Sequence, residues 1–272
     1  MKRLQPLSCG LILCVWLLMM IAGCAKVPPP PAEVAAPRTE GENLLAMWLE
    51  RGEALHSLEG LATVKVKTPQ GSLSGTQVVI AARPDRLRAE TLGPFGIPLL
   101  SLAADGRQLT VLLPGDNLYY AGAASTENLA RFTRMPIPPT ALVDILLWQP
   151  PLVAFEELAT FRTASGGWRL LLVSGPQRQE LSFDAAARLE QVRYYSGDSL
   201  QLSVAYAGFA DNSPLPRRIF LEQPPYALEA SLEFREQSVN QPSPPGRFSL
   251  QPPPGVGIIP LDQPEKPTGV AR

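Results

Sequence analysis

Apolar side chains recur along the chain with two different periods. From about Glu42 they recur near the helical spacing of 3.6 residues, which predicts an opening helix. Its apolar positions are Leu45, Trp48, Leu49, Ala54 and Leu55. After Gly60 the period becomes two, as in strands with one buried face. The first predicted strand buries Ala62, Val64 and Val66, and the last buries Tyr226, Leu228, Ala230, Leu232 and Phe234.

Short turns separate the predicted strands. Pro84-Asp85, Asp105-Gly106 and Gly166-Gly167 are typical turn-forming pairs. Closely spaced strands joined in this way indicate an antiparallel meander with one dry face and one wet face. A sheet with so many strands and one apolar face either closes into a barrel or is covered by other elements.

One further helical segment is predicted between two groups of strands, from Thr126 to Trp148. It has two pieces, Glu127 to Phe132 and Thr140 to Trp148, because the prolines between them stop the first helix and preset the second. The second piece is apolar nearly all round, which predicts burial on more than one side. Two interpretations remain open, a plug that fills the barrel or a lid over a lipid cavity. The candidate lid and cavity residues are Met135, Ile137, Leu142, Ile145, Leu146 and Trp148.

The first residues of the chain have the features of an export signal. Lys2 and Arg3 precede an apolar run that is too short to span a membrane comfortably and ends in Ala22-Gly23-Cys24. This arrangement predicts a bacterial lipoprotein signal peptide over residues 1–23, with the lipid attached to Cys24. The alternative is an ordinary secreted protein. The other two cysteines lie inside the apolar run, so no disulfide framework is expected.

Composition refines this picture in two ways. The 24 Lys and Arg balance 25 Asp and Glu, which argues against a nucleic-acid-binding surface. The 30 prolines concentrate near both ends of the chain. We therefore predict a lipidated, proline-rich tether over residues 24–41, a folded domain over 42–261 and a disordered tail over 262–272.

The sequence offers little material for catalysis. His56 is the one histidine, so a histidine-based triad partner for a sheet-borne serine and a multi-histidine metal site are both excluded. The acidic residues are scattered over the predicted wet faces, where solvation explains them. We expect no enzymatic activity, no metal and no cofactor.

The loop Gly93-Pro94-Phe95-Gly96-Ile97-Pro98 is unusual because it carries apolar side chains and no charge. Loop tips are normally polar. Two interpretations are open. Phe95 could fold back and pack under the sheet, or prolines and glycines could hold Phe95 and Ile97 out in solvent for contact with a membrane or a partner.

The order of several short motifs resembles the LolB family of outer-membrane lipoprotein receptors. In that family the loop reads Asn-Pro-Leu-Gly, and a Gly-Met-Pro-Ile-Pro stretch leads into a lid helix. The matching residues here run from about Trp48 to Val239 and are Trp48, Leu58-Glu59-Gly60, Gly93-Pro94-Phe95-Gly96, Arg134-Met135-Pro136-Ile137-Pro138, Tyr206-Ala207-Gly208-Phe209 and Leu215-Pro216. The segment from Gln241 to Leu261 extends past the typical family end and is similar to a wider group of lipoproteins with LolA-like folds.

The resemblance implies an α+β, mainly β fold, an incompletely closed antiparallel β-barrel with a helical lid over an apolar cavity. It implies a monomeric lipoprotein on the periplasmic face of the outer membrane that accepts acylated lipoproteins from the carrier LolA and inserts them into that membrane. Phe95 occupies the place of the family's membrane-inserting leucine. The alternative is a structural or scaffolding lipoprotein, or a carrier of another lipid, on the same fold.

Overall fold

The computed structural model describes residues 33–210, 215–244 and 246–263. The predicted signal peptide and Cys24 lie outside the described residues, as do residues 264–272 of the predicted tail. Among the described residues, no helix is both long and apolar enough to cross a bilayer.

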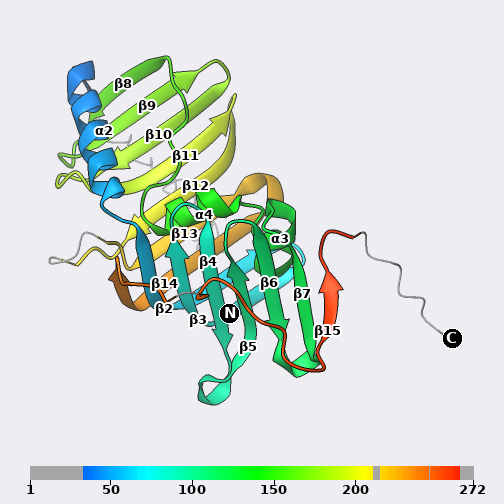
Figure 1. Cartoon of the computed structure of the whole chain (residues 1–272). Coiled ribbons are helices and arrows are strands. Elements are labelled where there is room, and N and C mark those ends of the chain that lie inside the picture. Colours follow the sequence, from blue (N-terminus) through cyan, green and yellow to red (C-terminus); the bar gives the residue numbers. More distant parts are fainter. Residues whose placement is uncertain (1–32, 211–214, 245, 264–272) are drawn as a thin grey trace, which may run out of the picture. The chain divides into compact units, whose positions relative to one another are not determined.

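A single sheet of fifteen strands forms most of the described part of the chain (Figure 1). Neighbouring strands are antiparallel except for the last pair, which is parallel. In spatial order the strands are β1 (Val34–Ala36), β8 (Glu157–Arg162), β9 (Trp168–Ser174), β10 (Gln177–Phe183), β11 (Leu189–Ser196), β12 (Ser199–Ala207), β13 (Arg218–Gln223), β14 (Leu228–Val239), β2 (Ser57–Thr68), β3 (Gly71–Ala82), β4 (Arg86–Leu92), β5 (Pro98–Ala104), β6 (Gln108–Leu113), β7 (Leu118–Ala123) and β15 (Gly257–Pro260). The sheet order ends at β1 and β15 without joining them, so the barrel is incompletely closed, as predicted.

The strand alternation predicted from the sequence is present in β2 and β14. Ala62, Val64 and Val66 are buried, and the register Val64↔Leu232 places the two apolar faces together. Tyr226 is an exception, because it belongs to the 3₁₀ turn η3 (Pro224–Tyr226) and is 56% exposed. Pro224 presets this turn and Ala227 reverses the chain in the left-handed region, so the buried face of β14 begins only at Leu228.

The opening helix begins earlier than predicted. Helix α2 spans Arg38–Glu53, because Pro37 directly precedes it and Arg162 forms an ion pair with Glu40 in its first turn. Part of the predicted tether is therefore ordered, and β1 precedes the helix within it. At the other end of the domain, Asp262 accepts hydrogen bonds from the Ala123 amide and from Nδ2 of Asn128, so this first residue of the predicted tail is also held.

The predicted helical pair forms α3 (Thr126–Thr133) and α4 (Pro139–Leu146). Ser125 caps α3 by accepting from the Asn128 amide, and the prolines before Thr140 begin α4. Helix α4 packs against the apolar face of the sheet, where it contacts β3 and β4. The fold is thus the mainly β half-barrel with a helical cover that the sequence predicts.

Candidate functional site

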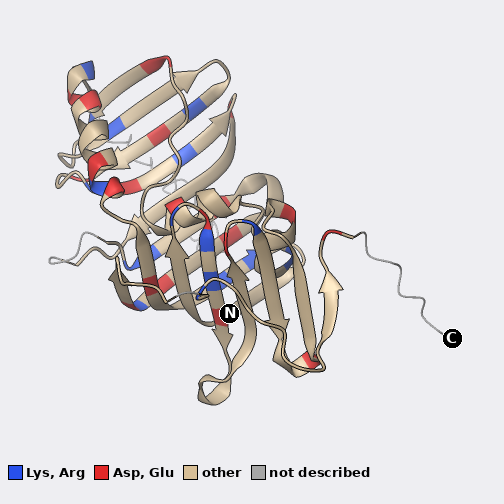
Figure 2. Ribbon diagram, in the orientation of Figure 1, with Lys and Arg blue, Asp and Glu red and all other residues tan. Residues whose placement is uncertain are grey.

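The loop between β4 and β5 is an exposed apolar finger, defined here as residues Gly93–Ile97. The side chain of Phe95 is 101% exposed and that of Ile97 is 63% exposed. The interpretation in which Phe95 packs under the sheet is therefore wrong. Figure 1 shows the finger projecting beyond the neighbouring strands, and Figure 2 shows no charged residue on it.

Backbone geometry fixes the finger. The Gly93 amide donates to the Ile97 carbonyl at 2.8 Å, which closes the loop, and Pro94 begins the 3₁₀ turn η1 (Pro94–Gly96). Phe95 has a φ of 61° and Gly96 a φ of 75°, so both lie in the left-handed region. That region is unfavourable for a phenylalanine. A strained backbone that holds a large apolar side chain in solvent is a feature of contact sites rather than of stability.

An apolar cavity of about 240 Å³ lies between the sheet and the helical segment. The sheet side is formed by β2 to β5 and the other side by the end of α3 and Met135. Its lining residues are Val64, Val66, Leu73, Ser74, Gly75, Gln77, Ala89, Thr91, Leu100, Leu102, Phe132, Thr133 and Met135. None of them carries a charge. The ring of Phe132 is held against Tyr120 in an edge arrangement with centroids 5.2 Å apart.

The finger and the cavity are parts of the same hairpin. Thr91 and Leu100 are cross-strand partners in β4 and β5, and both line the cavity. The finger begins two residues after Thr91. An apolar group that left the cavity along this hairpin would therefore meet the finger next.

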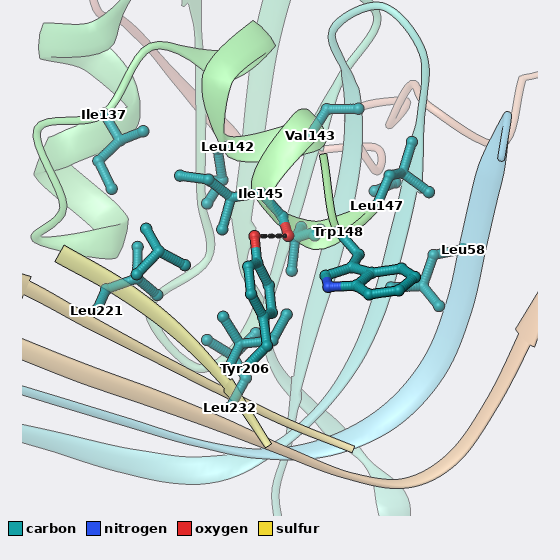
Figure 3. Packing of buried hydrophobic residues seen from close by; sticks show 14 of the residues in the cluster. Leu58, Ile137, Leu142, Val143, Ile145, Leu147, Trp148, Tyr206, Leu221 and Leu232 are labelled. Atoms are coloured by element: carbon teal, nitrogen blue, oxygen red, sulfur yellow. Dashed lines mark hydrogen bonds between the residues drawn. The ribbon is translucent and has the colours of Figure 1, made fainter. Parts of the chain in front are cut away.

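Most of the candidate lid residues fill the barrel interior instead of lining this cavity. Met135 lines it, whereas the other five are buried in the main core. They are Ile137, Leu142, Ile145, Leu146 and Trp148. Figure 3 shows the side chains of Leu142 and Ile145 on the side of α4 that faces Leu221, Leu232 and Tyr206. The plug and the cover are thus different parts of one helical segment. Helix α4 is the plug and fills the barrel interior, whereas residues 132–135 form the cover over the cavity.

Polar bonds fasten the plug at three points. The Tyr206 hydroxyl donates to the Ile145 carbonyl at 3.0 Å, and Nε1 of Trp148 donates to the Leu189 carbonyl at 3.0 Å. Arg83 forms an ion pair with Asp144, the charge on α4, at 2.6 Å. Burial raises the pKa of Asp144, and the pull of Arg83 in the opposite direction offsets this only in part. These bonds tie α4 and the residues just after it to the rest of the barrel.

Sequence reasoning missed most of the cavity wall. Leu100 and Leu102 alternate in β5 as buried strand residues do, and this signal could have placed them on the cavity face. Phe132 carried no such signal, because its place in the wall depends on how the end of α3 meets a distant hairpin.

No group of three or more His, Cys, Asp or Glu side chains in the described residues is arranged to hold a metal ion. His56 lies on the surface next to the end of α2, where its amide donates to the side chain of Asn240.

The sequence matches no protein-family model and no curated protein. Solved structures that are similar to this chain have low sequence identity to it. A domain from Vibrio parahaemolyticus named for outer membrane lipoprotein sorting is 11% identical, with a TM-score of 0.48 over 78% of this chain and 97% of that one. A LolA superfamily protein from Nitrosomonas europaea is 14% identical, with a TM-score of 0.47 over 76% and 97%. A DUF1329 family protein from Desulfovibrio piger is 12% identical, with a TM-score of 0.48 over 78% and 97%.

Proposed function

We propose that this protein is a non-enzymatic outer-membrane lipoprotein, anchored through Cys24, that accepts acylated lipoproteins from a LolA-like carrier and inserts them into the outer membrane. The observation that carries the proposal is the finger, in which Phe95 is fully exposed at the tip of the hairpin whose strands help to line an uncharged apolar cavity. Phe95 takes the part of the insertion residue that the sequence resemblance implies.

The energetics of acyl chains explain why both parts are needed. Each exposed methylene costs about 0.8 kcal/mol in water, so a chain crossing the periplasm has to stay covered. At about 240 Å³ the cavity is smaller than the roughly 300–1,000 Å³ of typical ligand sites. Loading therefore requires the cavity to widen. Since α4 is fastened at three points, the wall that moves is the end of α3 with Phe132 and Met135.

The finger would act at the last step of the transfer. Burying a phenyl ring in the hydrocarbon of the bilayer contributes about 1.5–3 kcal/mol. Because the turn already holds Phe95 away from the sheet, little ordering is required on contact. The hairpin then places the cavity mouth beside the bilayer, where a leaving acyl chain stays covered throughout.

A reconstituted transfer assay tests this function. The lipid-anchored protein in vesicles is mixed with a LolA-like carrier from the same organism that holds a labelled lipoprotein. We expect transfer to the protein and then insertion into the vesicles. Phe95→Glu should retain cargo acceptance but lose insertion.

Tyr226→Glu is the matched control, because Tyr226 is also an exposed aromatic residue on a turn between strands. It should insert cargo normally. Normal insertion by Phe95→Glu would contradict the role of the finger, and absence of transfer to the folded wild-type protein would contradict the receptor function itself.

One observation favours a second function. Val143, Ile145 and Leu147 are completely buried, so the protein's own side chains fill much of the barrel. This is the arrangement expected of a structural or scaffolding lipoprotein whose finger contacts a protein. Such a protein would co-purify with a stable partner and would carry no lipid.

A further inference from the structure

Arg134 lies at the edge of the apolar cavity in an unusual backbone conformation. It ends α3 with a φ of 60°, and its amide donates to the Ala130 carbonyl at 2.8 Å. Glycine is the residue that ordinarily ends helices in this conformation, because a side chain is strained there. Backbone strain of this kind is commonly retained where a side chain serves a ligand.

No hydrogen bond or ion pair within the described part of the chain includes the guanidinium group of Arg134. Its Nη1 atom is shielded from solvent and has no hydrogen-bond partner among the described residues. None of the ion pairs found in the described part of the chain includes it, although Arg83, Arg88, Arg169 and Arg188 all pair with carboxylates. A shielded cationic donor without an acceptor is unfavourable, and an anion at this place would relieve that cost.

The position of this group relates it to the cavity. A Cβ atom added to Gly71 would lie 3.6 Å from Nη1, so the guanidinium stands over the turn between β2 and β3. The residues on either side of Arg134, Thr133 and Met135, line the cavity, and so do Leu73 and Ser74 just after that turn. Arg134 therefore places a positive charge where the helical wall meets the hairpin, at the edge of a cavity with uncharged walls.

We propose that the cavity binds an acyl chain whose head group is anionic, a carboxylate or a phosphate, and that Arg134 is the counter-ion of that head group. The inference rests on the proposed function only for the acyl cavity, and it adds a second class of ligand, because the ester- and amide-linked chains of a lipoprotein carry no anionic head group. The chain supplies the apolar contact, and the paired head group at the rim sets which lipids are preferred.

Three ligands with one chain length test this inference: dodecanoate, dodecyl phosphate and dodecanol. Calorimetric titration uses the chain from residue 24 onward with Cys24→Ser, at a pH where both acidic head groups are ionised. We expect dodecanoate or dodecyl phosphate to bind about tenfold more tightly than dodecanol, the size of one charge-assisted hydrogen bond. The comparison of the two anions identifies the preferred head group.

Arg134→Gln should abolish the preference while leaving dodecanol binding within about twofold of wild type. Arg134→Gly guards against misfolding, since glycine suits the left-handed backbone, and it should behave in the same way. Arg131→Gln is the control, because it removes an exposed positive charge from the same helix.

The outcomes separate this inference from the proposed function. Dodecanol binding without any preference for the anions, or a preference that survives both Arg134 variants, would overturn the role of Arg134 and leave the cavity as an acyl site. Absence of binding by all three ligands would overturn the acyl cavity, and the role of Arg134 with it.

Discussion

Two neighbouring hairpins make the same kind of turn and put it to different uses. The β4–β5 and β6–β7 hairpins each turn through a 3₁₀ segment that begins with proline and includes or adjoins a residue with positive φ. In the finger that residue is Phe95. In the other turn, η2 (Pro114–Asp116), it is Asn117, which tolerates this conformation well.

The surroundings of the two turns differ as well. Nδ2 of Asn117 donates to the Gly255 carbonyl at 3.3 Å, and its carbonyl accepts from the Gly257 amide. The C-terminal segment therefore holds the β6–β7 turn, while nothing in the described residues covers the side chain of Phe95. A left-handed residue in a proline-initiated turn thus serves stability where its side chain is bonded and contact where its side chain is exposed.

The largest effect on the free energy of unfolding should come from weakening the C-terminal segment that holds the β6–β7 turn. Leu261 is 3% exposed and joins the main core next to Gly122. Leu261→Ala should lower the free energy of unfolding by about 3 kcal/mol, measured by urea denaturation. Ile258→Ala, at a side chain that is 62% exposed in the same segment, should change it by less than about 0.5 kcal/mol. If Leu261→Ala lowered the free energy of unfolding as little as Ile258→Ala does, the segment would be held by its backbone alone.

Exchanging the two tips tests whether position matters beyond composition. In the double variant Phe95→Asp with Asp116→Phe, each hairpin carries the residue type of the other. We expect vesicle binding to fall roughly 10- to 100-fold and to stay low, because the C-terminal segment restricts the approach of the β6–β7 turn to a bilayer. Flotation with vesicles measures this. Recovery of wild-type binding would mean that any exposed apolar tip suffices.

A smaller effect concerns backbone strain. Phe95→Gly relieves the left-handed conformation and should raise the free energy of unfolding by up to about 1 kcal/mol, while vesicle binding falls. Asn117→Gly should bring no gain, because asparagine fits the conformation and its bond to Gly255 is lost. Urea denaturation of both variants decides the matter, and a loss of stability in Phe95→Gly would show that the ring packs after all.

The smallest effect concerns pH and the plug beneath both hairpins. Because the pKa of Asp144 is raised in the folded state, folding favours its protonated form. The stability that this group contributes is complete below its ordinary pKa of 3.8 and declines as the pH rises through the folded value. Asp144→Asn should remove this decline. The free energy of unfolding of the wild type, measured relative to that of the variant, should therefore fall between acidic and neutral pH. An unchanged difference would contradict the shift.

Local sequence predicts much of this molecule. The prolines between Phe132 and Thr140 locate the break between two helices, and the alternation around Val64 identifies β2 with its buried face. Local rules failed where a turn overrode the period, as at Tyr226, and where a partner lies far along the chain. Nothing near Gly257 indicates that it pairs with Leu118 in parallel.

The candidate site likewise has features that local sequence predicts and features that depend on tertiary structure. The uncharged loop around Phe95 marks the finger, but the exposure of the ring depends on a backbone conformation that composition leaves open. Met135 was predicted on the cavity, whereas Leu142 and Trp148 turned out to fill the core. The separation of plug from cavity depends on which faces of the helical segment meet the sheet, and this is a tertiary property.

The pairing of β2 with β14 has a consequence for how the chain acquires its structure. Lys67 and Glu229, which form an ion pair across this junction, are 162 residues apart. Loop closure over such a separation slows folding, and the ribosome delivers β14 long after β2. The central seam of the barrel can therefore form only when synthesis is nearly complete. Until then the edge of β2 that pairs with β14 remains unprotected.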